Sequence, residues 1–174
     1  MNLNGLKNVT IWTTFKNTTV SQLICDFLKE ENTILHYIDA VNSFPLMEFQ
    51  NLVPANEDNK RVYDNIIITT SLNMQELYNI VKKIIENTEK IRLIVINGLD
   101  IMFRNSSFND SSQAHELLKM VFLRVRGSYS GGKLKTLVLN RTGSVPVPKR
   151  KKLKTESSNG IYEFTSKYYA DIEL

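Results

Sequence analysis

The stretch IRLIVINGLDIMF (residues 91–103) decides the fold class, because it is an unbroken apolar run that stops at the turn residues Asn97-Gly98. A short apolar run bounded by turn residues is typical of a strand buried on both faces of a sheet. In many nucleotide-hydrolysing folds such a strand ends in a carboxylate that holds Mg²⁺ against phosphates. The run therefore poses two questions: which elements surround the strand, and whether a phosphate-binding loop accompanies it.

Strand-like and helix-like segments alternate on either side of this run. Short apolar or β-branched runs predict strands at 8–12, 33–41, 66–70, 92–96 and 134–140. Apolar residues at helical spacing, cap signatures or a terminating proline predict helices at 20–30, 46–53, 74–88 and 113–126. Residues 161–174 are expected to form a closing strand or strand pair.

Alternating strands and helices imply a parallel sheet covered on both faces, because parallel strands need crossover connections. The runs ILHYI, IIITT, LIVI and TLVL fit strands buried on both sides. We therefore predict a three-layer α/β fold. The 174 residues are expected to form one domain, and a hydrophobic fraction of 42% is that of a globular protein.

Composition also limits the function classes. No stretch approaches the roughly 20 apolar residues of a membrane helix, and the N-terminal residues show no signal-peptide pattern. The single Cys25 excludes an internal disulfide, and with only His36 and His115 beside it a metal cluster is not expected. An intracellular location is the expectation.

The phosphate-binding half of a nucleotide site is missing from the sequence. The first strand leads into TTFKNTT (13–19), which has no glycine and does not place Lys16 in a Gly-Lys-Ser/Thr order. Asn97 ends the later strand, and Asp100 lies three residues beyond it. We predict a P-loop NTPase-type architecture without functional Walker motifs and assign no catalytic, metal or cofactor-binding residue. An α/β domain that never had such a site remains an alternative.

Several segments together resemble the RecA-type core of the eukaryotic strand-exchange recombinases. Among these proteins the chain is most similar to a divergent family of recombinase paralogs, the "chromosome segregation in meiosis" subunits of the yeast Shu complex. The matching segments run in order and cover most of the chain: VTIW, IDAVNSFPLMEFQNLVP, INGLDIMFRNSSF, HELL, KRKK and KYYAD.

This resemblance implies a noncatalytic DNA-binding subunit, with no cofactor, that forms a heterodimer with a second RecA-like Shu-complex subunit. It further implies that the pair helps a recombinase and its other paralogs to assemble on DNA in homologous recombination and error-free damage tolerance. A nuclear location follows from that role. The rival hypotheses are a divergent NTPase that uses Lys16 and Asp100, and an interaction scaffold without DNA contact.

The segment 141–160 is a basic, glycine- and proline-containing excursion. Its stretch KRKKLK (149–154) holds five of the 22 lysines and arginines and no acidic residue, and the other 17 nearly balance the 18 acidic residues. The resemblance places a DNA-binding loop here, and clustered cations predict salt-sensitive, sequence-independent contact with phosphates, as in forked or junction DNA. Nuclear import or a solvated charge run are the alternatives. The predicted DNA-binding residues are Lys149, Arg150, Lys151, Lys152 and Lys154.

The loop NSFPLMEF (42–49) is the predicted partner-binding segment, through Phe44, Pro45 and Leu46. A large aromatic residue before a proline must either pack into the core or dock on another protein. Other conspicuous residues are expected to be structural: Trp12, Cys25, His36, Tyr168 and Tyr169.

Overall fold

The computed structural model describes residues 6–13, 15–86, 89–128, 133–140 and 158–173. The predicted basic segment therefore lies outside the described residues. The strands are β1 (Val9–Trp12), β2 (Thr33–Asp39), β3 (Ile66–Thr70), β4 (Ile91–Asn97), β5 (Leu134–Leu139) and β6 (Ile172–Glu173). The α-helices are α1 (Asn17–Leu28), α2 (Leu46–Leu52), α3 (Lys60–Asp64), α4 (Met74–Glu86), α5 (Leu99–Ser107), α6 (Ser111–Gly127) and α7 (Ser158–Tyr169), and a 3-10 turn spans Glu57–Asn59.

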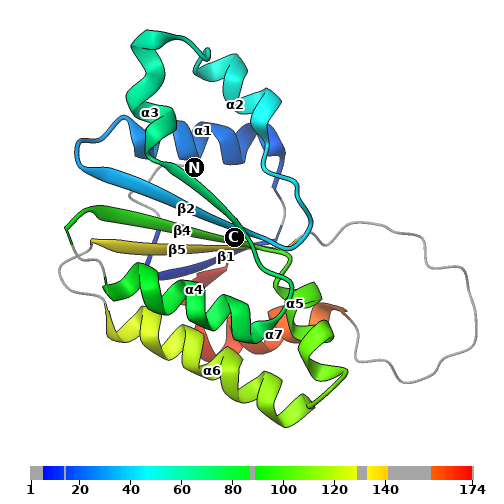
Figure 1. The fold of residues 1–174 in the computed structure, drawn as a ribbon. Coiled ribbons are helices and arrows are strands. Elements are labelled where there is room, and N and C mark those ends of the chain that lie inside the picture. The colour runs from blue at the N-terminus through cyan, green and yellow to red at the C-terminus, as the bar shows by residue number, and fades with distance from the viewer. Residues whose placement is uncertain (1–5, 14, 87–88, 129–132, 141–157, 174) are drawn as a thin grey trace, which may run out of the picture.

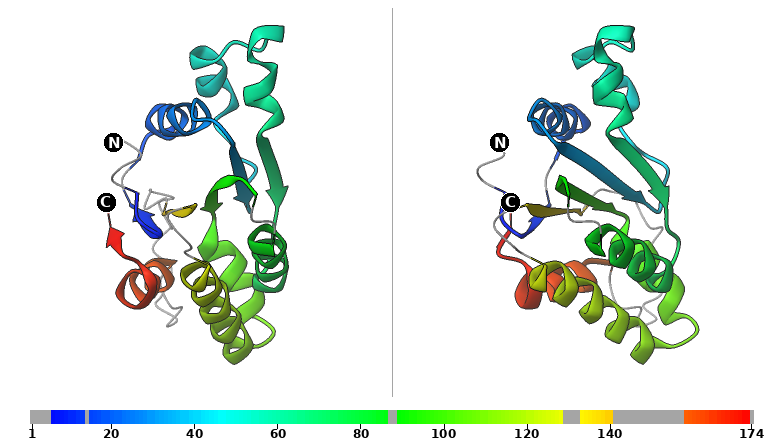
Figure 2. Two further views of the ribbon diagram at one scale, coloured as in Figure 1. Left: turned by 90° about the vertical axis from the view of Figure 1, so that its left-hand side faces the viewer. Right: turned by 60° about the vertical axis from the view of Figure 1, so that its left-hand side comes forward.

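All six strands pair in parallel, in the order β3-β2-β4-β5-β1-β6. Helices α1, α2 and α3 cover one face of the sheet, and α4, α5, α6 and α7 cover the other (Figures 1 and 2). The predicted three-layer α/β fold is thus confirmed, and it is consistent with a RecA-like core. Because all strands run the same way, their carboxyl ends meet at one edge of the sheet and their amino ends at the other.

Two buried apolar clusters hold the layers together, one on each face of the sheet. In β4 the side chains alternate between them, with Leu93 and Val95 toward α1 and Ile94 and Ile96 toward α4 and α6. The caps expected from the sequence form: the amide of Glu76 donates to the Asn73 side chain at 2.9 Å, and the amide of Gln113 donates to Asp110 at 3.0 Å. No helix among the described residues is long and apolar enough to cross a membrane.

The predicted burial of IIITT on both sides is wrong. β3 is the outermost strand of the sheet, and Ile67 and Ile68, on opposite faces, are 40% and 51% exposed. Its apolar composition matches that of a central strand, but only β2 lies beside it. The strand therefore carries more apolar surface than its position in the sheet buries.

The predicted closing strand or strand pair is wrong for most of its length, because the segment is largely helix α7, and only the short strand β6 follows it. Ile161, Tyr162, Thr165 and Tyr169 are buried at spacings of one, four and eight residues, which places them on one helical face. Tyr168 points away from this face and is 54% exposed, so its expected place in the core is wrong as well. Trp12, Cys25 and Tyr169 are buried as expected.

Gly98 links β4 to α5, a helix that the sequence analysis did not assign. Its φ of 81° is in the left-handed region, which favours glycine, and its carbonyl accepts the first hydrogen bonds of α5. A Cβ at this position would lie 2.9 Å from the Cβ of Ala40 in the neighbouring loop. The turn therefore requires glycine for both conformation and space.

We expect Gly98→Ala to lower the free energy of unfolding by about 1–3 kcal/mol, because it combines backbone strain with a close contact. Denaturant unfolding of the full chain measures the change. Gly127→Ala is the matched control, since nothing lies within 4 Å of a Cβ at Gly127. Equal unfolding midpoints for the two variants would contradict the role assigned to Gly98.

Candidate functional site

The predicted DNA-binding residues, Lys149 to Lys152 and Lys154, lie outside the described residues, but both flanks of their segment are described. Before the segment, β5 ends at the carboxyl edge of the sheet, and after it α7 begins beside α5 (Figure 1). Tyr162 in α7 donates a hydrogen bond to the Asp100 carboxylate at 2.8 Å, and its hydroxyl lies 3.5 Å from the carbonyl of Leu139. The two ends of the basic segment are thus tied to each other and to α5.

The Tyr162–Asp100 pair is stable because the phenol stays protonated. Burial, and then the neighbouring Asp100 carboxylate, raise the pKa of Tyr162 well above its usual range. Asp100 is therefore engaged as a hydrogen-bond acceptor within the fold. This contact is a structural use of the carboxylate that the rival NTPase hypothesis would need for Mg²⁺.

Lys16, the other residue of the rival hypothesis, sits at the N-cap of α1, where its carbonyl accepts the amides of Thr19 and Val20. β5 lies between β1 and β4, so the connection that follows β1 is separated from Asp100 by a strand. Among the described residues, no group of three or more His, Cys, Asp or Glu side chains could hold a metal ion.

A buried carboxylate organises the loop that follows β2. Asp39, 2% exposed, accepts hydrogen bonds from the amides of Val41 at 2.9 Å and Ser43 at 2.6 Å. The side-chain amide of Asn97 bridges the Asp39 carboxylate at 3.1 Å and the Ser43 hydroxyl at 2.7 Å. The carboxyl ends of β2 and β4 thereby fix the path of residues 40–45. Asp39 was not among the residues predicted from the sequence, because its only signal there is its position between a strand and a turn.

This loop places the three predicted partner-binding residues differently. Phe44 is half-buried, with its ring 5.0 Å from that of Tyr37 and 6.2 Å from that of Phe49, and Pro45 is buried. Leu46, at the start of α2, is 48% exposed. Phe44 therefore packs partly into the core, as one sequence hypothesis stated, while Leu46 is left open to contact.

Leu46 belongs to a larger apolar surface beside β3. Seven of the ten exposed large hydrophobic side chains in the described residues lie on β3, on the segment just after it, or on the loop and helix that follow β2. Clusters of this kind mark interaction sites more often than single exposed residues do. We call this set the β3–α2 surface: Val41, Leu46, Met47, Leu52, Ile67, Ile68 and Leu72.

The β3–α2 surface includes a free sheet edge. Ile68 lies opposite Tyr37 in the β2–β3 register, on the face of the sheet where Phe44 packs. Ile67 faces the other way, toward the layer of α4. Because β3 is the outermost strand, its outer edge offers backbone groups to which a further strand can add. Both faces of this edge thus present apolar side chains.

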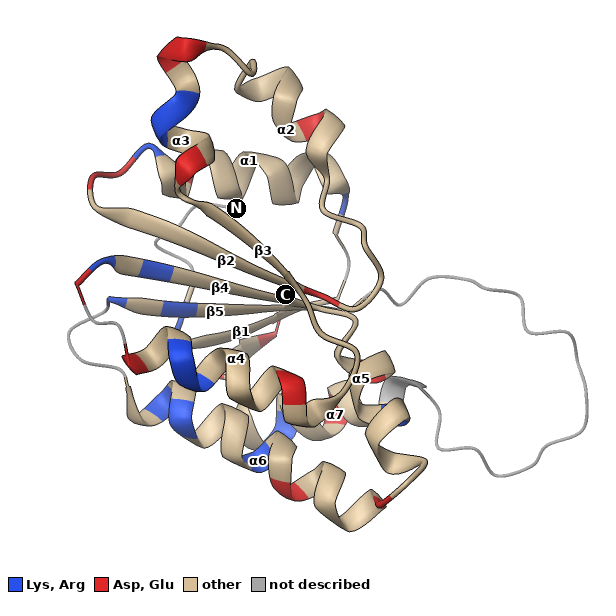
Figure 3. Ribbon diagram, in the orientation of Figure 1, with Lys and Arg blue, Asp and Glu red and all other residues tan. Residues whose placement is uncertain are grey.

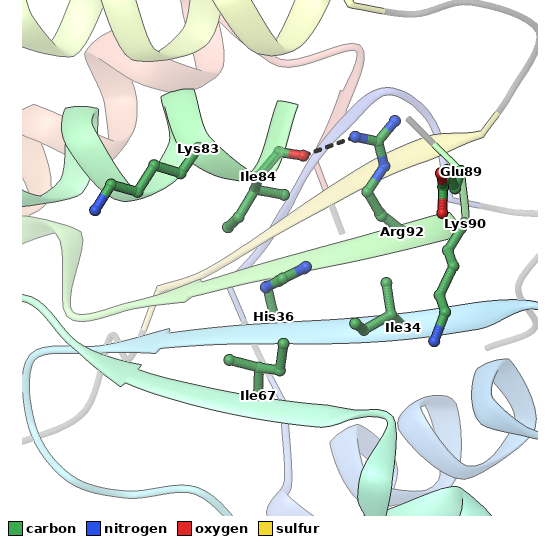
Figure 4. A pocket seen from close by; sticks show the side chains of 8 residues that line it. All are labelled: Ile34, His36, Ile67, Lys83, Ile84, Glu89, Lys90 and Arg92. Carbon is green, nitrogen blue, oxygen red and sulfur yellow. Dashed lines mark hydrogen bonds between the residues drawn. The ribbon is translucent and has the colours of Figure 1, made fainter. Parts of the chain in front are cut away.

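On the α4 side, Ile67 lines a cavity of about 300 Å³ (Figure 4). Its apolar lining comes from Ile34, Ile67 and Ile84, and its charged side chains are Lys83, Glu89, Lys90 and Arg92. The Arg92 guanidinium donates to the Ile84 carbonyl at 2.7 Å, which fixes it at the end of α4 (Figure 4). This mixture suits an apolar side chain with an acidic neighbour.

His36 also lines this cavity and is half-buried. Burial, and then the positive charge of Arg92, lower the pKa of His36 to about 4. The imidazole is therefore neutral near pH 7, which agrees with a structural rather than a charged role for this residue.

We expect the imidazole of His36 to titrate near pH 4 in an NMR pH series. Because this pKa lies below the unfolded value of about 6.5, the folded state binds fewer protons, and stability falls as the pH drops from about 6.5 to 4. His36→Gln should flatten that part of the stability curve. A midpoint near 6.5 would contradict the burial described here.

Comparisons with known proteins relate this chain to one protein family. The family model described as "Shu complex component Csm2, DNA-binding" matches residues 9–93 and 86–170. The Saccharomyces cerevisiae protein "Chromosome segregation in meiosis protein 2" is 33% identical, and the match covers 98% of both chains. The protein of the same name from Candida glabrata is 34% identical over 97% of this chain and 95% of its own. The Kluyveromyces lactis protein is 25% identical over 58% of this chain and 62% of its own.

Proposed function

Because this chain belongs to the Csm2 family of Shu complex components, we propose that it acts as a noncatalytic, DNA-binding subunit of such a complex. In this proposal it binds a second RecA-like subunit as an obligate heterodimer, and the pair promotes assembly of a recombinase filament. The process served is homologous recombination and error-free damage tolerance in the nucleus.

The observation that carries this proposal is the β3–α2 surface. A chain that works alone gains nothing from an outermost strand with isoleucines exposed on both faces, whereas a subunit of a complex can bury them. Leu46 and Met47 extend the apolar area onto α2, and the buried Asp39 network fixes the loop that leads to them. The surface is therefore preorganised, which lowers the entropic cost of binding.

The geometry favours a partner segment in extended conformation. Such a segment can pair with the outer edge of β3 and place alternate side chains on the two faces of the sheet. On one face its side chains would meet Ile68 and Leu46, and on the other they would enter the cavity beside Ile67. The lysines of the cavity favour an acidic residue in that segment.

The DNA-binding part of the proposal rests on the basic residues Lys149 to Lys152 and Lys154, and on the description of the matching family as DNA-binding. The tie between Tyr162, Asp100 and Leu139 supports it, because it gives the basic segment a fixed base on the carboxyl edge. Contact through phosphates would make binding independent of sequence.

Co-purification of the tagged full chain from cells, followed by mass spectrometry, tests the partner proposal. We expect a second RecA-like subunit in stoichiometric amount, and recombinase paralogs in smaller amount. Recovery of the chain alone, from lysates in which such subunits are present, would contradict an obligate heterodimer.

The noncatalytic role predicts that the full chain does not bind a fluorescent ATP analogue above background and releases no phosphate from ATP. The β1–α1 connection has no glycine, and Asp100 is engaged by Tyr162, so the site offers neither a phosphate cradle nor a free metal carboxylate. Saturable binding that Lys16→Ala or Asp100→Ala removes would instead support the rival NTPase.

A further inference from the structure

Cations gather at the amino edge of the sheet, opposite the edge from which the segment of Lys149 to Lys152 leaves. They come from the first residues of β4 and β5, the residues before β1 and β5, and the last turns of α4 and α6 (Figure 3). The group contains more than half of the lysines and arginines in the described part of the chain. We call it the amino-edge surface: Lys7, Lys82, Lys83, Lys90, Arg92, Arg124, Arg126, Lys133 and Lys135.

The fold brings these residues together from distant parts of the sequence. In a parallel sheet every strand begins at the same edge, and α4 and α6 run back toward it, so their last turns end there. The amide of Arg92 donates to the carbonyl of Lys133 at 2.7 Å, which joins the starts of β4 and β5. The Arg92 guanidinium reaches the carbonyl of Ile84, which joins α4 to the same edge.

Local packing accounts for some of these cations. Arg126 pairs with Asp171 at 3.1 Å, Arg124 donates to the hydroxyl of Tyr78 at 3.1 Å, and Arg92 is buried against α4. Basic residues near helix C-termini also complement the helix dipole.

Lys7, Lys82 and Lys133 are different, because all three are exposed, do not line the cavity beside Ile67, and belong to neither ion pair found among the described residues. The acidic residues on this side are Glu86, Glu89 and Asp171, together with Asp26, Glu30, Glu31 and Asp64, which come before β2 and β3. Around α4, α6 and β5 the balance therefore remains positive.

We propose that the amino-edge surface binds the phosphate backbone of a second DNA segment, separate from the one held by Lys149 to Lys152. β4 runs for seven residues between the two edges, a separation of about 20 Å or more at the rise of a strand. The basic segment follows β5, which ends at the opposite edge of the sheet, so the amino-edge surface can contact a different DNA segment. The inference rests on the proposed DNA-binding function and adds a second contact surface to it.

The test is a salt titration of DNA binding by the full chain, with a forked oligonucleotide and with a short duplex equal to one arm. The amino-edge variant carries Lys7→Gln, Lys82→Gln and Lys133→Gln. The matched control carries Lys16→Gln, Lys60→Gln and Lys119→Gln, which remove the same charge elsewhere. On the fork, we expect the amino-edge variant to bind about 10- to 100-fold more weakly and to lower the log–log salt slope by about 2 to 3.

On the single arm, the amino-edge variant and the control should bind alike, because that duplex is held through Lys149 to Lys152. Equal affinities of the two variants for the fork would overturn the proposal. A variant in which Lys149 to Lys152 are neutralised distinguishes failure of the amino-edge proposal from failure of the proposed DNA binding by the basic segment. If that variant keeps full affinity while the amino-edge variant loses it, the second site stands and the basic segment has been assigned wrongly.

Discussion

Replacing Lys149, Arg150, Lys151 and Lys152 with glutamine is expected to weaken binding to a forked oligonucleotide by about 100-fold or more at 0.1 M salt. Each cation that neutralises a phosphate releases counterions and contributes about 0.9 to the log–log salt slope, so four contacts should flatten the slope by about 3 to 4. The loss should be the same for unrelated DNA sequences, because phosphate contacts carry no sequence information. Fluorescence anisotropy at several salt concentrations measures both quantities.

The matched control places four glutamines at Lys16, Lys60, Arg61 and Lys119, outside both cationic surfaces. It carries the same net charge but should keep most of the wild-type affinity. An unchanged slope for the first variant would remove DNA contact from the basic segment. If that variant also failed to enter the nucleus, nuclear import would be the remaining role of these residues.

The double substitution Leu46→Asp and Ile68→Asp is expected to abolish recovery of the partner subunit in a pull-down. Both side chains are about half exposed in the free chain, so their carboxylates stay solvated and should cost little stability. In a complex that buries the β3–α2 surface, two unpaired carboxylates would each cost several kcal/mol, which corresponds to more than a 100-fold loss of affinity.

Leu123→Asp combined with Tyr168→Asp is the control, because both residues are about half exposed and lie on α6 and α7 rather than on β3 or α2. Normal recovery of the partner by the first variant would show that the β3–α2 surface is not the interface. Phe44→Ala is a less specific probe than the sequence suggested. Its ring packs on Tyr37 and Phe49, so we expect a moderate loss of stability along with any loss of binding.

The layer architecture could be predicted from the sequence because burial sets the pattern of each element. The alternation of strands and helices gave the parallel sheet, and the capping residues Asn73 and Asp110 marked helix starts that the structure confirms. The closing segment was assigned wrongly, because aromatic and β-branched residues fit a strand by propensity, whereas their spacing fits one face of α7.

The partner surface could be predicted only in part. The aromatic-proline pair in the sequence pointed to Phe44. The sequence could not show that β3 is the outermost strand, so the apolar run of β3 was predicted to be buried on both sides. The sequence of an apolar strand does not show whether the strand lies at the centre or at the edge of a sheet. Only the strand order distinguishes these two positions. The Asp39 network was missed because its partners, Val41, Ser43 and Asn97, converge only in three dimensions.

The central claim is that the apolar strand β3 and the loop held by Asp39 form the partner-binding site of a DNA-binding subunit. Amide hydrogen exchange of the full chain, alone and in the complex that copurifies with it, tests this claim most directly. The account predicts slower exchange in the complex at residues 41–47 and 66–70, with little change along the exposed face of α6. Unchanged exchange in β3 and protection elsewhere would contradict it.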